Sequence, residues 1–559
     1  MVVLLIAVQF NLRALIGNGA GPVSLACYLS GQVDMNQYAY LDPTSFKPER
    51  WARDSPTNEE LGAFLSLPFG FGPRSCYGRR LVELECLLRP LTQRRYASNS
   101  QPQSLKPFSE IPGPKGLPIV GSLFDLIRGS TKAGDDFIFH QLALKYGPIA
   151  KVTTLGKPII VVSTPDAAAN MYRAEGKYPA RTNIDDNMNW IYRKNNALTM
   201  VFTGGKEWKR IRSSASKQIV PRRVANYAPG LCEIGDGFVE YVRRKRGPDG
   251  YLEDVSSALV KWAFQGICFM VYGERLDTFD DSKTDLQEFQ NAAIQLIGSL
   301  ASIANRPPLY KVFPTPTYRH FAQALTDVHK YGSQILKEKY DKVVEAIHSG
   351  VVDETKATSM MEQWLIEGNF SQKEALNLSC DIMAAGIDTT SNTATFLLHE
   401  VAKQPELQEK LYSEKMTLVR GCIKEILRLQ PAIPGVPRMT SEDIDIGGYH
   451  IPAKTQVVYL TYTVCRDPKY VEDPITFKPE RWARDSPTNE ELDAFLSLPF
   501  GFGPRSCYGR RLAELELYIM LCMVSKNFKL STQQHSLKKM QATLVKPDEL
   551  VKIKFTDRK

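Results

Sequence analysis

The ten residues FGFGPRSCYG, 500–509, constrain this chain more than any other segment. They place Cys507 in a loop between Gly503 and Gly509, with Arg505 two residues before the sulfur. Glycine lets the backbone approach a flat ligand where a β-carbon would clash, and arginine can pair with an anionic propionate. The helix-patterned run after the loop would point N–H groups at the sulfur and stabilise a thiolate. The segment therefore indicates a cysteine thiolate on haem iron. A buried structural cysteine in a glycine-rich turn is the alternative.

The pattern FxxGxRxCxG of this loop resembles the haem-ligand loop of the cytochrome P-450 family. The resemblance covers residues 104–559 and implies a mainly α fold with small β regions. It implies that Cys507 binds the iron of haem b, that Phe500 and Gly509 lie against the cofactor, and that Arg505 pairs with a propionate. Haem b would lie between a central helix and the helix that follows the cysteine.

A long helix is predicted in the centre of the chain. Ser371 and Glu374 form a capping-box pattern, an apolar run follows, and Pro405 ends it. Polar residues in the middle of an apolar helix are costly unless they have partners, and a threonine hydroxyl can bond the carbonyl four residues back and open the helix locally. The motif AAGIDTTS resembles the family's oxygen-binding kink, with Asp388 and Thr389 as the acid–alcohol pair. A cluster of satisfied core polar groups is the alternative.

Three charged residues are predicted to form a buried network. Glu425 and Arg428 lie three apart and face together on a helix, and Arg481 follows in FKPERW. Taken alone, ExxR is a common surface ion pair. In this order the motifs resemble the buried Glu–Arg–Arg network behind the haem, because buried charges need mutual pairing.

Two further segments are candidates for holding the haem propionates. Trp208 and Arg212 lie four apart in WKRIRSS, which resembles a family propionate clamp, although such a pair is more often a surface or packing contact. Arg438, in IPGVPR, occupies a family position that contacts a propionate. The run KPIIVVS, residues 157–163, predicts a strand.

A second copy of the haem-loop block lies near the N-terminus. Residues 46–85 repeat residues 477–516 at a constant offset, so Cys76 repeats Cys507, and the two copies differ at only two positions, Gly62 for Asp493 and Val82 for Ala513. A single displaced block is not a repeat array. It resembles a duplicated exon or a mis-joined gene, and we expect residues 1–85 not to fold independently. A second haem site would need upstream partners that residues 1–45 lack.

Residues 86–103 resemble a mitochondrial presequence. The segment is rich in arginine and serine and free of acidic residues, and RRYA at 94–97 resembles a matrix-peptidase site with cleavage after Tyr96. A basic linker is the alternative. The resemblance implies a mitochondrial protein on the matrix side of the inner membrane, associated with the membrane surface, if this internal segment marks the true start.

Four cations point to the electron donor. Arg510 and Arg511 follow the ligand loop, and Arg420 and Lys424 lie four apart on the predicted Glu425 helix. This face matches the one where mitochondrial members of the family bind a [2Fe-2S] ferredoxin, which is reduced by its own reductase. Ordinary solvated cations are the alternative. Substrates of such members are often sterols, steroids or secosteroids.

Composition and the order of the motifs limit the function. The net charge of +9 is mild and fits a docking face or presequence better than nucleic-acid binding. Ten scattered cysteines predict neither a disulfide framework nor a zinc site, and the apolar start is too short to span a membrane.

The motifs imply monooxygenation of an apolar substrate with O2. A haem-thiolate isomerase or dehydratase would not need Asp388 and Thr389. A non-catalytic product of a rearranged gene is a second alternative, supported by the duplication and by a short segment around Lys415 and Met416.

Overall fold

The computed structural model describes residues 105–558, apart from 118–119, 126–136, 155, 183–184, 305–307, 350–358, 414–415, 484–493 and 542–543. These residues belong to one compact unit, Leu105–Lys559. The predictions for the duplicated fragment, 1–85, and for the presequence-like segment, 86–103, lie outside the described residues and stay predictions.

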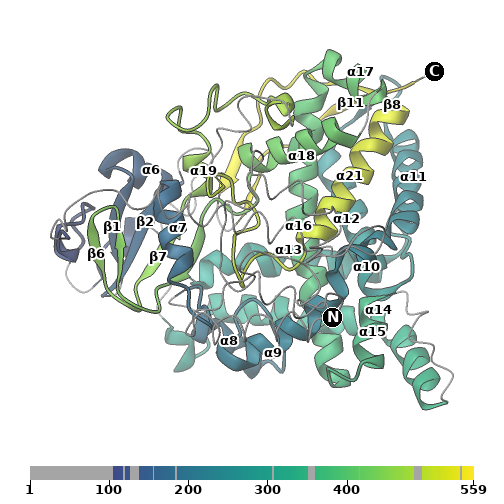
Figure 1. The fold of residues 1–559 in the computed structure, drawn as a ribbon. Helices are drawn as coiled ribbons and strands as arrows, with labels where there is room; N and C mark the ends of the chain where they lie inside the picture. The colour runs from purple at the N-terminus through teal and green to yellow at the C-terminus, as the bar shows by residue number, and fades with distance from the viewer. Residues whose placement is uncertain are drawn as a thin grey trace, which may run out of the picture. The chain divides into compact units, whose positions relative to one another are not determined.

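Helices form most of the described unit, as the sequence predicts (Figure 1). The α-helices are α6 Ile138–Tyr146, α7 Pro165–Arg173, α8 Asp185–Lys194, α9 Gly205–Ser216, α10 Pro221–Ala225, α11 Ala228–Lys245, α12 Val255–Tyr272, α13 Thr284–Ala304, α14 Pro316–His348, α15 Met360–Ile366, α16 Gln372–Ala402, α17 Pro405–Ser413, α18 Met416–Leu429, α19 Thr461–Val464 and α21 Arg510–Asn527. Four short 3-10 helices join them: η3 Phe108–Glu110, η5 Lys217–Ile219, η6 Leu309–Lys311 and η8 Pro479–Trp482.

Within the part of the chain that the structure describes, short strands form four small sheets. The strands are β1 Ile149–Thr154, β2 Lys157–Val162, β3 Tyr251–Leu252, β4 Val436–Met439, β5 Ile444–Ile446, β6 Tyr449–Ile451, β7 Gln456–Tyr459, β8 Phe528–Ser531, β9 Lys539–Gln541, β10 Val545–Pro547 and β11 Ile553–Asp557. The strand predicted over residues 157–163 is confirmed as β2. The mainly α architecture with small β regions is also confirmed.

The largest sheet positions one end of the functional site. Its strand order is β1-β2-β7-β4, in which β2 and β7 are parallel and the other pairs are antiparallel. Helices α6 and α7 lie beside this sheet, on the left of Figure 1. Strand β4 is an edge strand and pairs Arg438 with Val457 of β7, so the sheet holds this arginine at a defined place.

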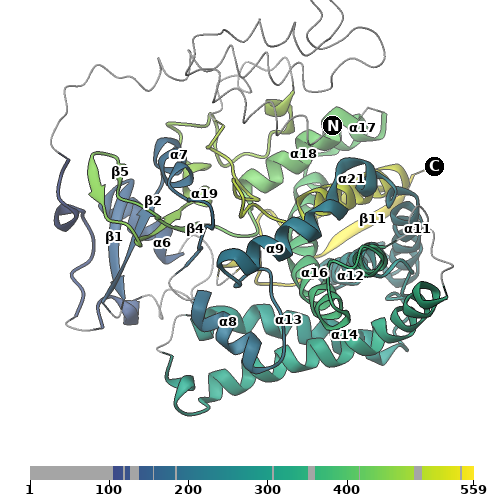
Figure 2. The ribbon, with the colours of Figure 1, turned by 60° about the horizontal axis from the view of Figure 1, so that its bottom comes forward.

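Helix α16 runs through the core, as the sequence predicts. Ser371 and Glu374 make both halves of the capping box, at 3.3 Å for Glu374 N to Ser371 Oγ and 2.9 Å for Ser371 N to Glu374 Oε2. The helix ends at Ala402, three residues before Pro405. Helix α12 lies along it and α14 passes nearby (Figure 2). Most of α16 is buried, so it forms the central wall of the molecule.

Helix α12 has the length and apolar composition of a membrane span, but 72% of its apolar window is buried inside the protein. It packs against α16 and α11. A buried core helix explains its composition without a membrane.

The short segment between α16 and the Glu425 helix still supplies two helices. Helix α17 ends at Ser413 and α18 begins at Met416, and residues 414–415 between them lie outside the described residues. Leu411 of α17 and Val419 of α18 are both buried. Both helices therefore contribute to the core on either side of the junction.

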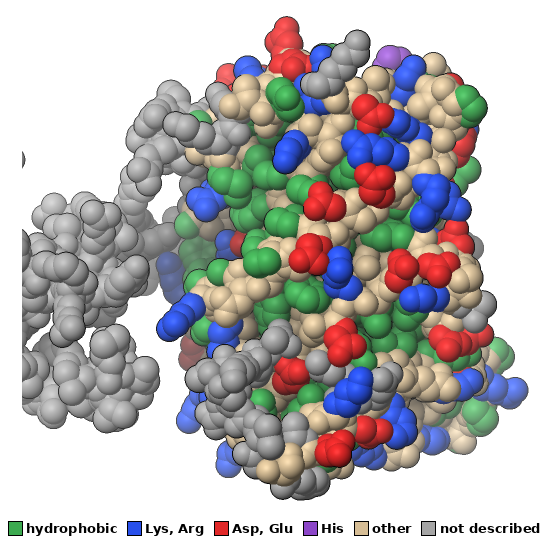
Figure 3. Space-filling view, turned by 90° about the vertical axis from the view of Figure 1, so that its right-hand side faces the viewer, with side chains coloured by type: hydrophobic (Ala, Val, Ile, Leu, Met, Phe, Trp, Pro, Cys, Tyr) green, Lys and Arg blue, Asp and Glu red, His purple; other side chains and the backbone are tan. Residues whose placement is uncertain are grey.

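The face on the right of Figure 1, to which α11 belongs, carries charges of both signs side by side (Figure 3). The basic end of α11 is paired with acids: Arg243 and Arg246 with Asp557, and Lys245 with Asp281. The cations at this end of α11 therefore have acidic partners on neighbouring segments.

Candidate active site

The loop that carries Cys507 is tightly turned. Gly501 and Gly503 have positive φ angles of 65° and 74°, which other residues rarely adopt. Cys507 N donates to Phe500 O at 2.8 Å, and Ser506 N donates to Gly503 O at 3.0 Å. These bonds close the loop directly before α21 and hold the cysteine at the N-terminus of that helix.

The Cys507 thiol is solvent-exposed although protein surrounds the loop. Burial raises its pKa, and the N–H groups of Gly509 and Arg510 and the charges of Arg181 and Arg212 act in the opposite direction. An accessible sulfur that is faced by N–H donors and two arginines suits an anionic metal ligand, because the thiolate is the form that binds metal. A β-carbon at Gly509 would meet no atom within 4 Å, so protein packing does not require glycine there.

One face of the buried helix α16 is open. Ala385 is exposed and Thr389 is half-buried, whereas Ile387 and Met383 between and beside them are fully buried. Thr389 Oγ1 donates to Ala385 O at 3.0 Å, the back-bond that the sequence predicts. The predicted local opening of the helix is wrong for this structure, because α16 is α-helical throughout residues 372–402. The hydroxyl adds its bond to an intact ladder.

Asp388 lies beside Thr389 in the chain but is buried, with 9% of its surface exposed. Burial raises the pKa of this carboxyl to about 6, and the charge of Lys546 on β10 acts in the opposite direction. A carboxyl with a pKa near 6 exchanges protons close to neutral pH, which suits a proton relay.

Trp208 and Arg212 both lie on α9, as predicted. The Arg212 guanidinium lies 5.5 Å from the ring centre of Tyr508, and it has no hydrogen-bond acceptor among the residues that the structure describes. Burial lowers its pKa, while the charge of Cys507 raises it. Arg212 therefore has free N–H donors close to the cysteine, which is what an anionic cofactor group needs.

Arg505 has several protein partners, and its predicted contact with a propionate stays a prediction. Its guanidinium stacks on Trp208 at 4.0 Å, and it donates to backbone carbonyls rather than facing an open space. Burial lowers its pKa to about 9. Its acceptors are Pro179 O at 2.7 Å, Thr203 O at 2.8 Å, and Met200 O and Val201 O at 3.5 Å each.

Arg438 also has protein partners. Its Nε donates to Glu175 Oε1 at 2.6 Å, and its Nη2 donates to Phe502 O of the cysteine loop at 3.0 Å. Glu175 was not expected from the sequence, nor was Arg181, whose Nη2 donates to Arg505 O at 3.1 Å. No local pattern marks either residue, because their partners lie hundreds of residues away.

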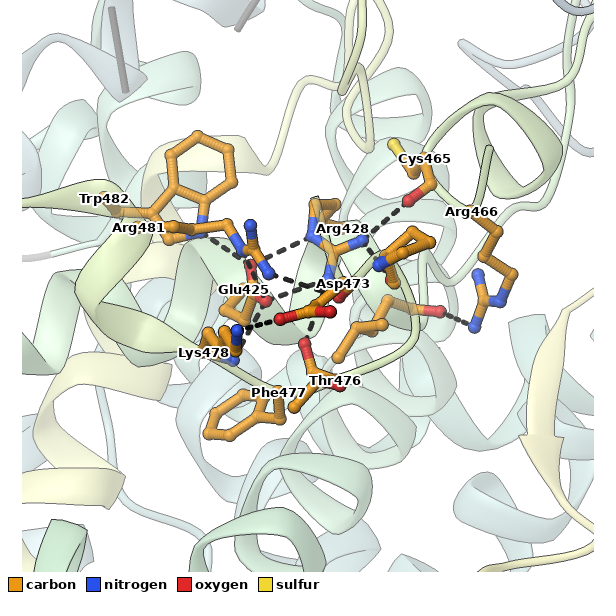
Figure 4. Close-up of polar contacts among 12 residues, drawn as sticks. Glu425, Arg428, Cys465, Arg466, Asp473, Thr476, Phe477, Lys478, Arg481 and Trp482 are labelled. Carbon is orange, nitrogen blue, oxygen red and sulfur yellow. Dashed lines mark hydrogen bonds and ion pairs between the residues drawn. The ribbon is translucent and has the colours of Figure 1, made fainter. Parts of the chain in front are cut away.

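The predicted charged network is assembled around Glu425 (Figure 4). Arg428 donates to both carboxylate oxygens, at 2.8 and 3.0 Å, and Arg481 Nε donates at 2.9 Å. The three side chains are between 0 and 4% exposed. Burial alone would raise the pKa of Glu425, but the bond from Arg428 and the two guanidinium charges lower it.

The network has two further members that were not predicted from the sequence. Trp482 Nε1 donates to Glu425 Oε2 at 2.8 Å, and Lys478 N donates to Oε1 at 3.0 Å (Figure 4). Arg428 also donates to the carbonyls of Cys465 and Pro474, at 2.6 and 2.7 Å. The network therefore ties α18 to the segment that leads into the cysteine loop.

The four predicted docking cations lie on α18 and α21, which pack together. Arg420, Lys424, Arg510 and Arg511 are exposed. The charges of Arg420 and Arg510 both act on Tyr518, so these two cations lie near one another. Arg510 pairs with Glu514 at 3.0 Å, and Lys424 lies over the Trp482 ring at 5.1 Å. Arg511 donates to Ile219 O at 3.0 Å.

Comparison with known proteins identifies the family. The cytochrome P450 family model matches residues 28–90 and 111–555, so the chain belongs to this family. The first matched segment contains the duplicated block. The chain is 30% identical to cytochrome P450 10 of Lymnaea stagnalis, over 81% of this chain and 86% of that protein.

Two further relatives are named as mitochondrial hydroxylases. The mouse 25-hydroxyvitamin D-1 alpha hydroxylase, mitochondrial, is 29% identical over 81% of this chain and 94% of its own length. The human sterol 26-hydroxylase, mitochondrial, is 27% identical over 75% and 84%. The chain is accordingly a haem-dependent monooxygenase with the fold of its family.

The residues present fit haem b. An accessible cysteine with N–H donors, an arginine with free donors at 212 and an open face on α16 supply a sulfur ligand, a propionate partner and a wall. When bound, the haem activates O2 for insertion into a C–H bond.

Proposed function

We propose that this chain is a mitochondrial monooxygenase that receives electrons from a [2Fe-2S] ferredoxin and hydroxylates an apolar, sterol-like substrate. Relatives along most of the chain are named as mitochondrial sterol and vitamin D hydroxylases, which supports the compartment and the substrate class. The single structural observation that carries the donor assignment is the cationic face on α18 and α21.

In this proposal the residues around the cysteine loop hold the haem. Cys507 binds the iron through its sulfur, and the N–H groups at the start of α21 stabilise the negative charge on that sulfur. Arg212 binds a propionate with its free donors. Phe500 and Gly509 border the cofactor.

The proposed proton path ends on α16. Asp388, with a pKa of about 6, takes up and releases protons near neutral pH. The Thr389 hydroxyl lies on the open face of the helix and can pass a proton onward when it leaves the Ala385 carbonyl.

The donor face is proposed to bind ferredoxin through long-range attraction. Arg420, Lys424 and Arg510 are exposed cations on two packed helices next to the Cys507 loop. An acidic iron–sulfur protein would be attracted to them, and the attraction weakens with salt because the Debye length falls from about 10 Å at 0.1 M to about 3 Å at 1 M.

A ferredoxin titration at low and high salt tests this assignment. Replacing Arg420 and Lys424 together by glutamine should weaken binding at low salt and flatten its salt dependence, while the carbon-monoxide spectrum stays unchanged. Lys337→Gln, which removes an exposed cation on α14, is the matched control. If the double variant binds as tightly and with the same salt slope as the wild type, the ferredoxin proposal is refuted and a flavoprotein donor becomes the better explanation.

Membrane-surface association is part of the proposal. Three apolar side chains on the connection between α13 and α14 are exposed: Leu309 by 51%, Val312 by 86% and Phe313 by 52%. Exposed apolar groups of this size favour a lipid surface. Changing all three to serine should reduce co-sedimentation with vesicles that mimic the inner membrane. Unchanged co-sedimentation would contradict this part of the proposal.

A further inference from the structure

Glu175 is a buried carboxylate that lies against the cysteine loop. It follows the end of α7 and is 4% exposed. A β-carbon at Gly503 would lie only 2.8 Å from Glu175 Oε2 and 3.2 Å from Oε1, so the carboxylate touches the backbone of that loop. Gly503 lies four residues before Cys507, in a loop closed by two backbone hydrogen bonds, so the carboxylate contacts the same short loop that carries the sulfur ligand.

The two carboxylate oxygens of Glu175 differ in their hydrogen bonding. Oε1 accepts from Arg438 Nε at 2.6 Å, and both side chains are 2–3% exposed. Oε2 is buried and has no hydrogen-bond donor among the residues that the structure describes. A buried charged oxygen without a donor is costly, and a proton on it would remove that cost.

Glu175 has three cationic neighbours. Arg438, Arg505 and Arg181 favour the ionised carboxylate, and the Tyr172 hydroxyl is a further titratable neighbour. Burial outweighs the three arginines, so the pKa of Glu175 is raised above its ordinary value. An added negative charge nearby would act in the same direction as burial and favour the protonated carboxyl.

We propose that Glu175 takes up one proton when the haem held by Cys507 accepts an electron. The electron converts Fe(III) to Fe(II), and a proton from water forms an O–H bond at Glu175 Oε2, while Oε1 keeps its bond from Arg438. The added negative charge at the iron is compensated by the proton. This inference rests on the haem site of the proposed function, but not on the identity of the electron donor.

Potentiometric titration of the haem-loaded enzyme tests the coupling, with dithionite and redox dyes in place of ferredoxin. A one-electron, one-proton couple moves by about 59 mV for each tenfold change in proton concentration. In a titration that runs upward from the ordinary glutamate pKa of about 4.3, we expect the wild-type midpoint potential to fall with rising pH, at a slope that approaches this value in part of the range. In Glu175→Gln the slope should disappear, because an amide cannot take up the proton.

Asp388→Asn is the matched control, because it removes another buried carboxyl with a raised pKa while leaving Glu175 in place. It should keep the wild-type slope. The proposal is overturned if Glu175→Gln keeps the slope, if the wild type has none, or if the slope is lost in Asp388→Asn instead. The carbon-monoxide spectrum separates these results from a failure to bind haem.

A second measurement covers the case in which Glu175→Gln does not retain haem. The reduced-minus-oxidised infrared spectrum of the wild type should gain a protonated-carboxyl C=O band that shifts in D2O. A spectrum without such a gain refutes proton uptake by Glu175 whatever the variant does.

Discussion

Replacing Glu425 at the centre of the buried charged network should lower the stability of the protein. Five donors end on its two oxygens: Arg428 Nε and Nη2, Arg481 Nε, Trp482 Nε1 and Lys478 N. Glu425→Gln keeps the shape but places an NH2 group against donors and leaves two buried guanidinium charges without their counter-charge. Removing one partner of a buried ion pair costs about 3–5 kcal/mol, and we expect Glu425→Gln to lower the free energy of unfolding by this amount.

The matched control is an exposed ion pair. Lys337 and Asp341 on α14 are 73% and 55% exposed, so Asp341→Asn should cost no more than about 0.5 kcal/mol. Denaturant unfolding of the haem-loaded proteins, followed by the Soret band and tryptophan fluorescence, measures both changes. If Glu425→Gln unfolds at the same denaturant concentration as Asp341→Asn, the buried ion pairs do not stabilise this fold.

The Glu425 carboxylate also makes the free energy of unfolding depend on pH. The pKa of Glu425 is lower in the folded protein than its ordinary value of about 4.3. Its contribution to stability is therefore complete above about pH 4.3 and is lost as the pH falls through the lower folded value. The difference in unfolding free energy between wild type and Glu425→Gln should be constant at neutral pH and should shrink below about pH 4. A difference that instead changes between pH 6 and 8 would contradict the lowered pKa.

Three other predictions concern the site and the start of the chain. Cys507→Ser should abolish the thiolate-type Soret band of the carbon-monoxide complex, whereas Cys76→Ser should leave it intact; the reverse result would move the ligand to the N-terminal copy. Thr389→Ala should divert electrons to peroxide, and Asp388→Asn should slow turnover by about 100-fold and remove a pH transition near 6, measured as reductant consumed per product over a pH series; unchanged coupling and rate in both variants would sink the acid–alcohol assignment. Protein recovered from mitochondria should begin near Ala97 on N-terminal sequencing, and an intact Met1 would contradict the presequence assignment.

Local chemistry was enough to predict several elements. The Ser371–Glu374 capping box defines the start of α16 because its hydrogen bonds join residues three apart. The β-branched run after Lys157 forms β2. In each case the partners are close in the chain, so the sequence pattern carries the information.

The partners of the arginines were decided by the tertiary structure alone. From the sequence, Arg438 and Arg505 are equivalent candidates for a propionate. In the fold, the end of α7 brings Glu175 to Arg438, 263 positions away, and four backbone carbonyls surround Arg505. Arg212 keeps free donors because its turn of α9 faces the cysteine.

For Asp388 too, the sequence shows the motif and the tertiary structure decides how the residue behaves. The motif around it is visible in the sequence, but its pKa of about 6 depends on how deeply α16 is covered and on Lys546, which β10 brings near. Burial and long-range charge are properties of the packed molecule. The sequence alone determined which residue types are available for the chemistry, and packing decided which of them are paired, which are free and where their protons bind.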